Sequence, residues 1–200
     1  MPPSLPPEVP DFDSICKVFS LVDREVWIVT SADGERQGGL VATWVFQAAL
    51  DPQRPVVAAA IAPIHNTAQI IGASGSFALH LINPSQIDVA WRFGLSSGRD
   101  QNKLEGLTVT TARTGAPILQ DSIAWLDCRV LTTTDIGDRI LFWGEVVAGQ
   151  ATGTGPVLSE RALFAAATSE QRLRLKENLS RDIDELGPLH EHWRNTLKSS

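Results

Sequence analysis

The step His65-Asn66-Thr67 is the strongest candidate in this sequence for binding an anion. The residues after it, 68–74, predict a short helix that ends near a glycine. A helix start offers unpaired N–H groups and the positive end of the helix dipole, and Asn66 and Thr67 add polar side chains. Ordinary helix capping would use the same residues, so an anion site and a simple cap both remain open.

A second candidate is the stretch 38–50, where small and apolar residues follow two glycines. A ligand can approach such a backbone closely. Trp44 can stack on an aromatic ligand or fill the core, and Thr43 lies on the opposite face of the strand. Lys103 follows Arg99 in a polar loop, where a cation can reach a phosphate or a carbonyl group or stay solvated.

Other chemistry finds little support in the sequence. There is no GxSxG, HExxH, CxxC or P-loop motif. Cys16 and Cys128 lack an evident base and are interpreted as packing residues, and the spacing of His190 and His192 suits no common zinc motif. We therefore predict no catalytic side chain and no metal site.

Composition narrows the function classes further. The net charge of −6 over 200 residues argues against a nucleic-acid or anionic-membrane surface, and no apolar run is long enough to span a bilayer. The N-terminus lacks the pattern of a signal peptide, and two cysteines make no disulfide framework. A cytoplasmic protein is the simplest interpretation.

The elements that must position these residues are mostly short strands. Residues 1–13 hold five prolines and predict a loose arm. Within 14–155 we expect a helix or a strand entry at 13–19, a hairpin turn at Asp33-Gly34, and helices at 66–74 and 85–93. Strands are expected at 24–31, 36–47, 54–62, 76–82, 122–134 and 139–148. This pattern predicts a closed or partly closed antiparallel barrel, and the absence of a βαβ rhythm argues against a Rossmann domain.

The last segment, 156–200, predicts a helical extension. Thr168 and Gln171 have capping-box spacing, and an apolar stripe follows at Leu175, Leu179, Ile183 and Leu186. Gly187-Pro188 is expected to stop this helix. Its stripe must be buried, either on its own barrel or on a partner chain.

Taken in order over residues 23–149, these pieces resemble the flavin reductase-like family of FMN-binding split barrels. Residues 39–48 are similar to the family's flavin-contacting strand, in the version found in reductase modules fused to flavodiiron proteins. The proline-marked turn at 51–55, the helix start at Asn66-Thr67, the segment 103–107 and the stretches 116–119 and 124–130 carry the rest of the resemblance.

The resemblance implies a mainly β fold, a six-stranded Greek-key split barrel that forms a homodimer with FMN near the interface. It implies that the isoalloxazine is bordered by Gly39, Leu40, Val41, Ala42, Thr43 and Trp44. His65, Asn66 and Thr67 would hold the phosphate end, and Ala62, Lys103 and Arg139 are further candidates for cofactor binding.

One departure bears on function, because Gly137-Asp138-Arg139 stands where many members of the family have Gly-Asp-His. We therefore carry three hypotheses. The first is an oxidoreductase that transfers a hydride from NAD(P)H to FMN, or to FAD or riboflavin as substrate, and serves a partner monooxygenase or another electron acceptor. The second is a protein that binds FMN or another cofactor and transfers electrons, but is not reduced directly by NAD(P)H. The third is a cofactor-free dimeric interaction module.

Overall fold

The structure is a computed structural model, and it describes residues 11–99, 101–151 and 153–198. In chain order its elements are α1 (Phe12–Leu21), β1 (Trp27–Asp33), β2 (Arg36–Ala42), β3 (Val45–Gln47), β4 (Val56–Ile61), α2 (Asn66–Ser74), β5 (Ser76–Leu81), a 3₁₀ turn η1 (Pro84–Gln86), α3 (Ile87–Leu95), β6 (Val109–Thr111), β7 (Pro117–Leu119), β8 (Ala124–Asp135), β9 (Ile140–Ala151), α4 (Glu160–Ala165) and α5 (Ser169–Lys198). Most of the predicted proline-rich arm, residues 1–10, lies outside the described residues.

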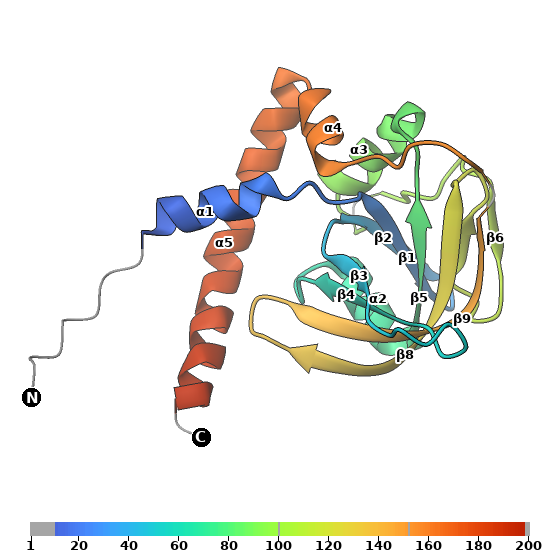
Figure 1. The fold of residues 1–200 in the computed structure, drawn as a ribbon, viewed down its shortest axis with the longest axis horizontal. Coiled ribbons are helices and arrows are strands. Elements are labelled where there is room, and N and C mark those ends of the chain that lie inside the picture. The colour runs from blue at the N-terminus through green and yellow to red at the C-terminus, as the bar shows by residue number, and fades with distance from the viewer. Residues whose placement is uncertain (1–10, 100, 152, 199–200) are drawn as a thin grey trace, which may run out of the picture.

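Seven strands form one antiparallel sheet that curls on itself, in the order β2-β1-β5-β8-β9-β4-β3 (Figure 1). The mainly β split-barrel fold predicted from the sequence is confirmed. The expected strand at 36–47 divides at Thr43 and Trp44, so seven strands replace the predicted six. Its first half, β2, pairs with β1 at one edge of the sheet, and its second half, β3, pairs with β4 at the other. One stretch of chain therefore links the two edges and closes the barrel.

Apolar side chains on the two faces of β1 belong to two separate cores. Val29 belongs to the interior core, which α2 completes with Ala68 and Ile71. Ile28, with Val26 just before β1, belongs to an outer core, which lies beneath α3 and α4. The alternation along β1 follows from the two-residue period of a strand. The helices α2 and α3 thus pack on different parts of the same sheet.

Packing of these two helices explains the glycine pair of β2. A Cβ atom at Gly38 would lie 2.8 Å from Ile70 of α2, and one at Gly39 would lie 2.4 Å from the ring of Phe93 of α3. A side chain at Gly39 would also meet the backbone oxygen of Val29 and could not be accommodated without moving α3, whereas one at Gly38 would require at least that Ile70 change its rotamer. The small size of Gly39 is therefore required by the fold, whether or not a ligand also approaches it.

Buried polar side chains fasten the small ribbon of β6 and β7 to the sheet. The carboxylate of Asp127 accepts hydrogen bonds from the backbone N–H groups of Arg113 and Thr114 at 2.6 and 2.9 Å. His80 is fully buried, with Nδ1 lying 3.0 Å from Ile28 O, and its Nε2 accepts from the N–H of Leu119 at 3.1 Å. These bonds satisfy groups that would otherwise be costly to bury.

The C-terminal helix α5 starts as predicted and continues past its expected end. The capping box forms, with Thr168 N donating to Gln171 Oε1 at 2.8 Å. The predicted stop at Gly187-Pro188 is wrong, because α5 runs through Pro188 to Lys198. A proline removes one helical hydrogen bond, but contacts with the β8–β9 turn hold the helix beyond it.

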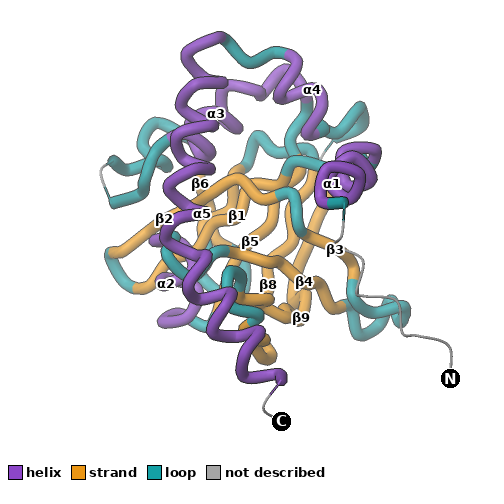
Figure 2. Tube along the Cα trace, turned by 90° about the vertical axis from the view of Figure 1, so that its left-hand side faces the viewer, coloured by secondary structure: helices purple, strands orange, loops and turns teal. Residues whose placement is uncertain are grey.

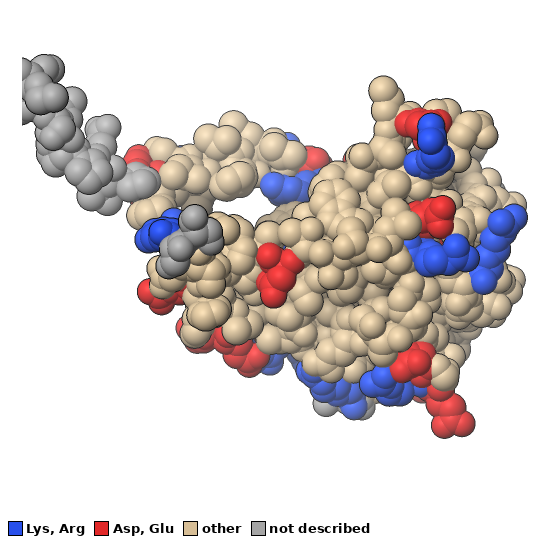
Figure 3. Space-filling view, turned by 90° about the horizontal axis from the view of Figure 1, so that it is seen from below, with Lys and Arg blue, Asp and Glu red and all other residues tan. Residues whose placement is uncertain are grey.

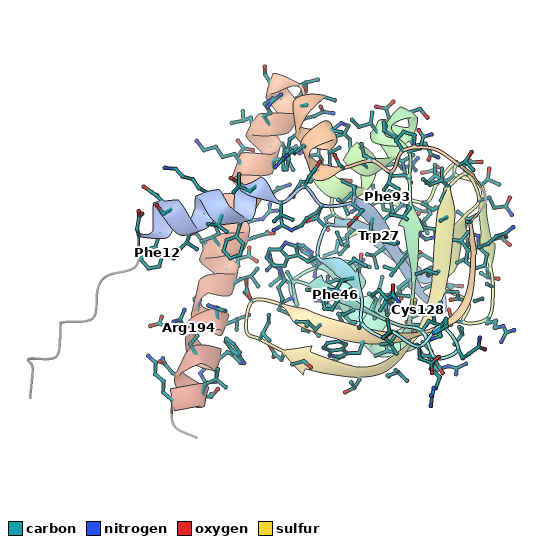
Figure 4. All side chains as sticks on the ribbon, in the orientation of Figure 1. Phe12, Trp27, Phe46, Phe93, Cys128 and Arg194 are labelled. Atoms are coloured by element: carbon teal, nitrogen blue, oxygen red, sulfur yellow. The ribbon has the colours of Figure 1, made fainter. Side chains whose placement is uncertain are left out.

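The predicted apolar stripe of α5 is only partly buried. Leu186 is 3% exposed, whereas Leu179 and Ile183 are 60% and 61% exposed. Figure 2 shows α5 passing along one side of the curled sheet, and α1 stands on the same side. The residue range 13–19, expected as a helix or a strand entry, is helical, and none of α1 is buried. Figure 4 shows Phe12 out on this helix, while Phe93 and Cys128 lie within the body of the domain.

Candidate functional site

The corner between β2 and β3 presents an aromatic ring beside a cation. Trp44 is 45% exposed, and its backbone oxygen accepts a hydrogen bond from Ala60 N at 2.9 Å. The guanidinium carbon of Arg139, just before β9, lies 4.9 Å from the centroid of the Trp44 ring. Arg139 also lies 3.4 Å from the carboxylate of Asp138. This geometry stacks the Arg139 guanidinium on the Trp44 ring, and the exposed part of the pair offers an aromatic ligand a place to stack.

The start of α2 lacks a side-chain cap. His65 is the N-cap residue and makes no capping hydrogen bond with its side chain. Asn66 is half-buried and lines a groove of about 680 Å³, whose other lining residues are Glu35, Arg36, Gln37, Ile70, Gly98, Arg99, Gln101 and Asn102. Two guanidinium groups and several amides are suited to a phosphate group. Thr67 is only 3% exposed, so Asn66 is better placed than Thr67 to meet a ligand.

His65 sits among charges from three parts of the chain. Burial is the main cause that lowers the pKa of its imidazole, and the charges of Arg139 and Lys103 lower it further, while Asp182 opposes them. The Nε2 atom of His65 lies 3.4 Å from Asp182 Oδ2. A lowered pKa keeps the ring neutral at pH 7, so it meets Asp182 as a hydrogen-bond donor through Nε2.

Lys103 points into the protein. It is 5% exposed, and its Nζ donates to the backbone oxygens of Gly39 and Phe93 at 3.0 and 2.8 Å. It therefore ties its loop to β2 and to the end of α3. Of the three possibilities left open by the sequence, the solvated one is excluded by this burial, and the carbonyl groups that Lys103 reaches belong to the protein backbone.

The other predicted site residues fall into two groups. The side chains of Leu40, Ala42 and Ala62 are buried in the barrel, and Val41 packs against the outer core beneath α3. Thr43 is half-buried at the corner before Trp44. Flavin contact for these residues, and for Gly39, stays a prediction. The structure brings Trp44, His65, Lys103 and Arg139 into one charged neighbourhood.

The helix α5 adds residues to this neighbourhood that the sequence did not reveal. Asp182 meets His65, and His190 Nδ1 lies 3.3 Å from Ile136 O and 3.5 Å from Asp138 Oδ1. His190 therefore lies at the surface but is tied to the β8–β9 turn. Asp182, Leu186 and His190 are spaced four residues apart and so share one helix face. That spacing was a usable signal, but the expected stop at Gly187-Pro188 hid it.

Two other kinds of site, a membrane-spanning helix and a cluster of metal ligands, are missing among the described residues. On the face seen in Figure 3, basic and acidic residues alternate without a continuous patch of one sign. Within the described ranges no helix is long and apolar enough to cross a membrane. The same residues contain no group of three or more His, Cys, Asp or Glu side chains arranged to hold a metal ion.

Comparison with known proteins finds similarity to flavin reductases and related flavoproteins. A family model described as "Flavin reductase like domain" matches residues 19–164. The ferric-chelate reductase (NAD(P)H) of Archaeoglobus fulgidus is 30% identical over 145 residues, which cover 72% of this chain and 85% of that protein. Diflavin flavoprotein A 1 of Synechocystis is 26% identical over 137 residues, which cover 67% of this chain but only 23% of that much longer protein.

A solved structure shares this fold over most of the chain. Nitrilotriacetate monooxygenase component B from Mycobacterium thermoresistibile is 25% identical and superposes with a TM-score of 0.65, covering 74% of this chain and 82% of that one. The helix α5 begins after the last residue that the family model matches.

Proposed function

Because the chain belongs to the flavin reductase like domain family, and is thus an oxidoreductase, we propose that it binds FMN and transfers a hydride from NAD(P)H to flavin. The observation that carries this proposal is the joint position of the exposed Trp44–Arg139 surface and the cationic neighbourhood of the uncapped α2 start. An aromatic ring system with a phosphate tail needs both features.

The residues present suit such a cofactor. Asn66, with Arg36 and Arg99 in the adjoining groove, would hold the phosphate, and Trp44 with Arg139 would border the ring. When bound, flavin supplies the redox chemistry by accepting a hydride from nicotinamide and passing the electrons on. The protein has to bind, orient and shield the reactants, which requires no acid or base from a side chain.

The first experiment is a visible spectrum of the protein with FMN, followed by NADH or NADPH. We expect a bound flavin whose absorption band bleaches with one of the two nucleotides. A protein that binds no FMN, FAD or riboflavin refutes flavin binding and favours the interaction module.

The phosphate contact has its own test. Asn66→Ala should weaken FMN by about 1 kcal/mol or more, and riboflavin much less, because only FMN carries a phosphate that the amide can bond. Asn178→Ala on α5 is the matched control, since Asn178 lies far from the groove in the sequence and does not line it. Equal weakening of both flavins refutes the phosphate role of Asn66.

A second function remains a candidate because of how Arg139 is held. It stands in place of the family histidine, and the Trp44 ring and the Asp138 carboxylate both engage it. A site built this way suits a protein whose bound flavin receives its electrons from another reductase and not from NAD(P)H. Bound flavin that dithionite reduces, but neither NADH nor NADPH reduces, would favour this alternative.

The surroundings of the reaction are also proposals. We expect a homodimer, since α1 leaves Phe12 and Phe19 exposed at 65% and 61%, and light scattering measures this directly. We expect a barrel domain at 14–155, a helical extension at 156–200, and a cytoplasmic location that suits the two free cysteines. The relative named as a monooxygenase component supports a partner monooxygenase or another electron acceptor.

A further inference from the structure

Lys103 carries a charge that the described part of the protein does not neutralise. None of the ion pairs among the described residues includes it. Its two hydrogen bonds go to the backbone oxygens of Gly39 and Phe93, which use two of the three protons of an ammonium group. Burying an ammonium group without a carboxylate costs several kcal/mol, so its presence here asks for a reason.

The nearby carboxylates already have other partners. Asp138 lies 3.4 Å from Arg139 and 3.5 Å from His190. Asp182 lies 3.4 Å from His65 and 4.0 Å from Arg181. Lys103 is close enough to this group for its charge to act on His65, yet no carboxylate pairs with it. Burial alone lowers the pKa of Lys103 to about 8, and no anionic neighbour raises it.

Part of the charge is balanced by local dipoles. Phe93 lies in the last turn of α3, where helix carbonyl groups carry partial negative charge. A partial charge of this size does not cancel a full one. A ligand that becomes negative in this neighbourhood is therefore stabilised by Lys103, and a neutral ligand is not.

We propose that the unpaired charge of Lys103 makes this site bind reduced flavin more tightly than oxidised flavin. The inference rests on the proposed function. Hydride transfer turns the nicotinamide into a cation and delivers two electrons and one proton to a neutral flavin ring, which then carries one negative charge. Lys103 acts through its field and is a positioning residue, since both of its hydrogen bonds go to the protein backbone.

The test is the ratio of two affinities, measured anaerobically for oxidised and for dithionite-reduced FMN. An opposite charge shifts an ionisation by about 1–3 pKa units, so we expect the wild-type protein to prefer reduced FMN roughly tenfold or more. Lys103→Gln removes the charge but keeps two N–H donors for the two carbonyl groups. It should lower this preference about tenfold, which corresponds to a midpoint potential about 30 mV lower.

Controls separate charge from structure. Lys103→Arg should keep the preference, and Lys176→Gln on the exposed face of α5 should leave it unchanged. An unaltered ratio in Lys103→Gln overturns the proposal, as does equal weakening of both forms. If Lys103→Gln does not fold, the pH dependence of the wild-type protein tests the proposal. Its preference for reduced over oxidised FMN must fall as the pH rises through and beyond the pKa of Lys103. A preference that stays constant there also overturns the proposal.

The same measurements keep the two proposals apart. Binding of oxidised FMN tests the proposed function, and the ratio tests Lys103. A wild-type protein that binds neither form overturns both. A protein that binds both forms equally overturns only the role of Lys103.

Discussion

Gly137, in the turn between β8 and β9, offers a sharp test of how firmly α5 is held over the candidate site. Its φ angle is 87°, and a Cβ atom there would lie 2.7 Å from the Cα atom of His190 and 3.0 Å from the backbone oxygen of Leu189. Gly115 is the matched control, because its φ angle is 85° and a Cβ atom there would meet nothing within 4 Å. Gly137→Ala and Gly115→Ala therefore share the backbone strain, and only the first collides with α5.

The difference between the two variants measures the docking of the helix. Left-handed backbone costs a residue with a Cβ about 1–2 kcal/mol, and both variants lose that amount. The atoms closest to a Cβ atom at Gly137 belong to the backbone of α5, so in Gly137→Ala the helix must shift or detach from the turn. Detachment of α5 exposes Leu186, whose burial stabilises the fold by about 1.5–3 kcal/mol, and separates His190 from the turn. We expect Gly137→Ala to lose about 2 kcal/mol more than Gly115→Ala.

Urea unfolding measures the free energies of both variants, and hydrogen exchange locates the change. Amides at 182–198 should exchange faster in Gly137→Ala than in Gly115→Ala, and the fluorescence of Trp193, which is half-buried against the turn, should shift. Equal losses in the two variants, with unchanged exchange in α5, would show that the helix does not depend on this contact.

Three further outcomes follow from the fold. Burial lowers the pKa of His80 to about 4, so the unfolded chain binds more protons than the folded protein between pH 4 and about 6.5. The free energy of unfolding of the wild-type protein should therefore fall by about 3 kcal/mol as the pH falls from 6.5 to 4, and urea unfolding should show a smaller loss for His80→Gln. Asp127→Asn should cost about 2 kcal/mol, because two backbone N–H groups lose a charged acceptor; an unchanged urea midpoint contradicts this. Thr168→Ala should remove about 1 kcal/mol and loosen the first turn of α5, seen by hydrogen exchange against Ser180→Ala as control.

The sequence predicted elements well where local chemistry decides them. The hairpin at Gly34, with its φ angle of 59°, and the capping box at Thr168 both depend on neighbouring residues only. The barrel followed from the spacing of strands. The division of 36–47 could not be seen, because the choice between two partner strands at Thr43 is made by residues far along the chain.

The candidate site shows the same boundary between local and distant information. Asn66 and Trp44 were found because a helix start and a glycine-led strand are visible in the sequence. The burial of Lys103 could not be predicted from its polar loop, because it depends on α3 and β2 together. The pairing of His65 with Asp182 joins residues 117 positions apart, so no local pattern could reveal it.

The corner at Thr43 and Trp44 also has a mechanical consequence. The strands β2 and β3 are the two edges of the sheet, and only Thr43 and Trp44 join them. If the two edges move apart, the backbone angles of these two residues must therefore change. These two residues act as a hinge, and the half-exposed indole of Trp44 moves with them. Intrinsic tryptophan emission should therefore report the opening of the barrel whenever a ligand wedges the edges apart.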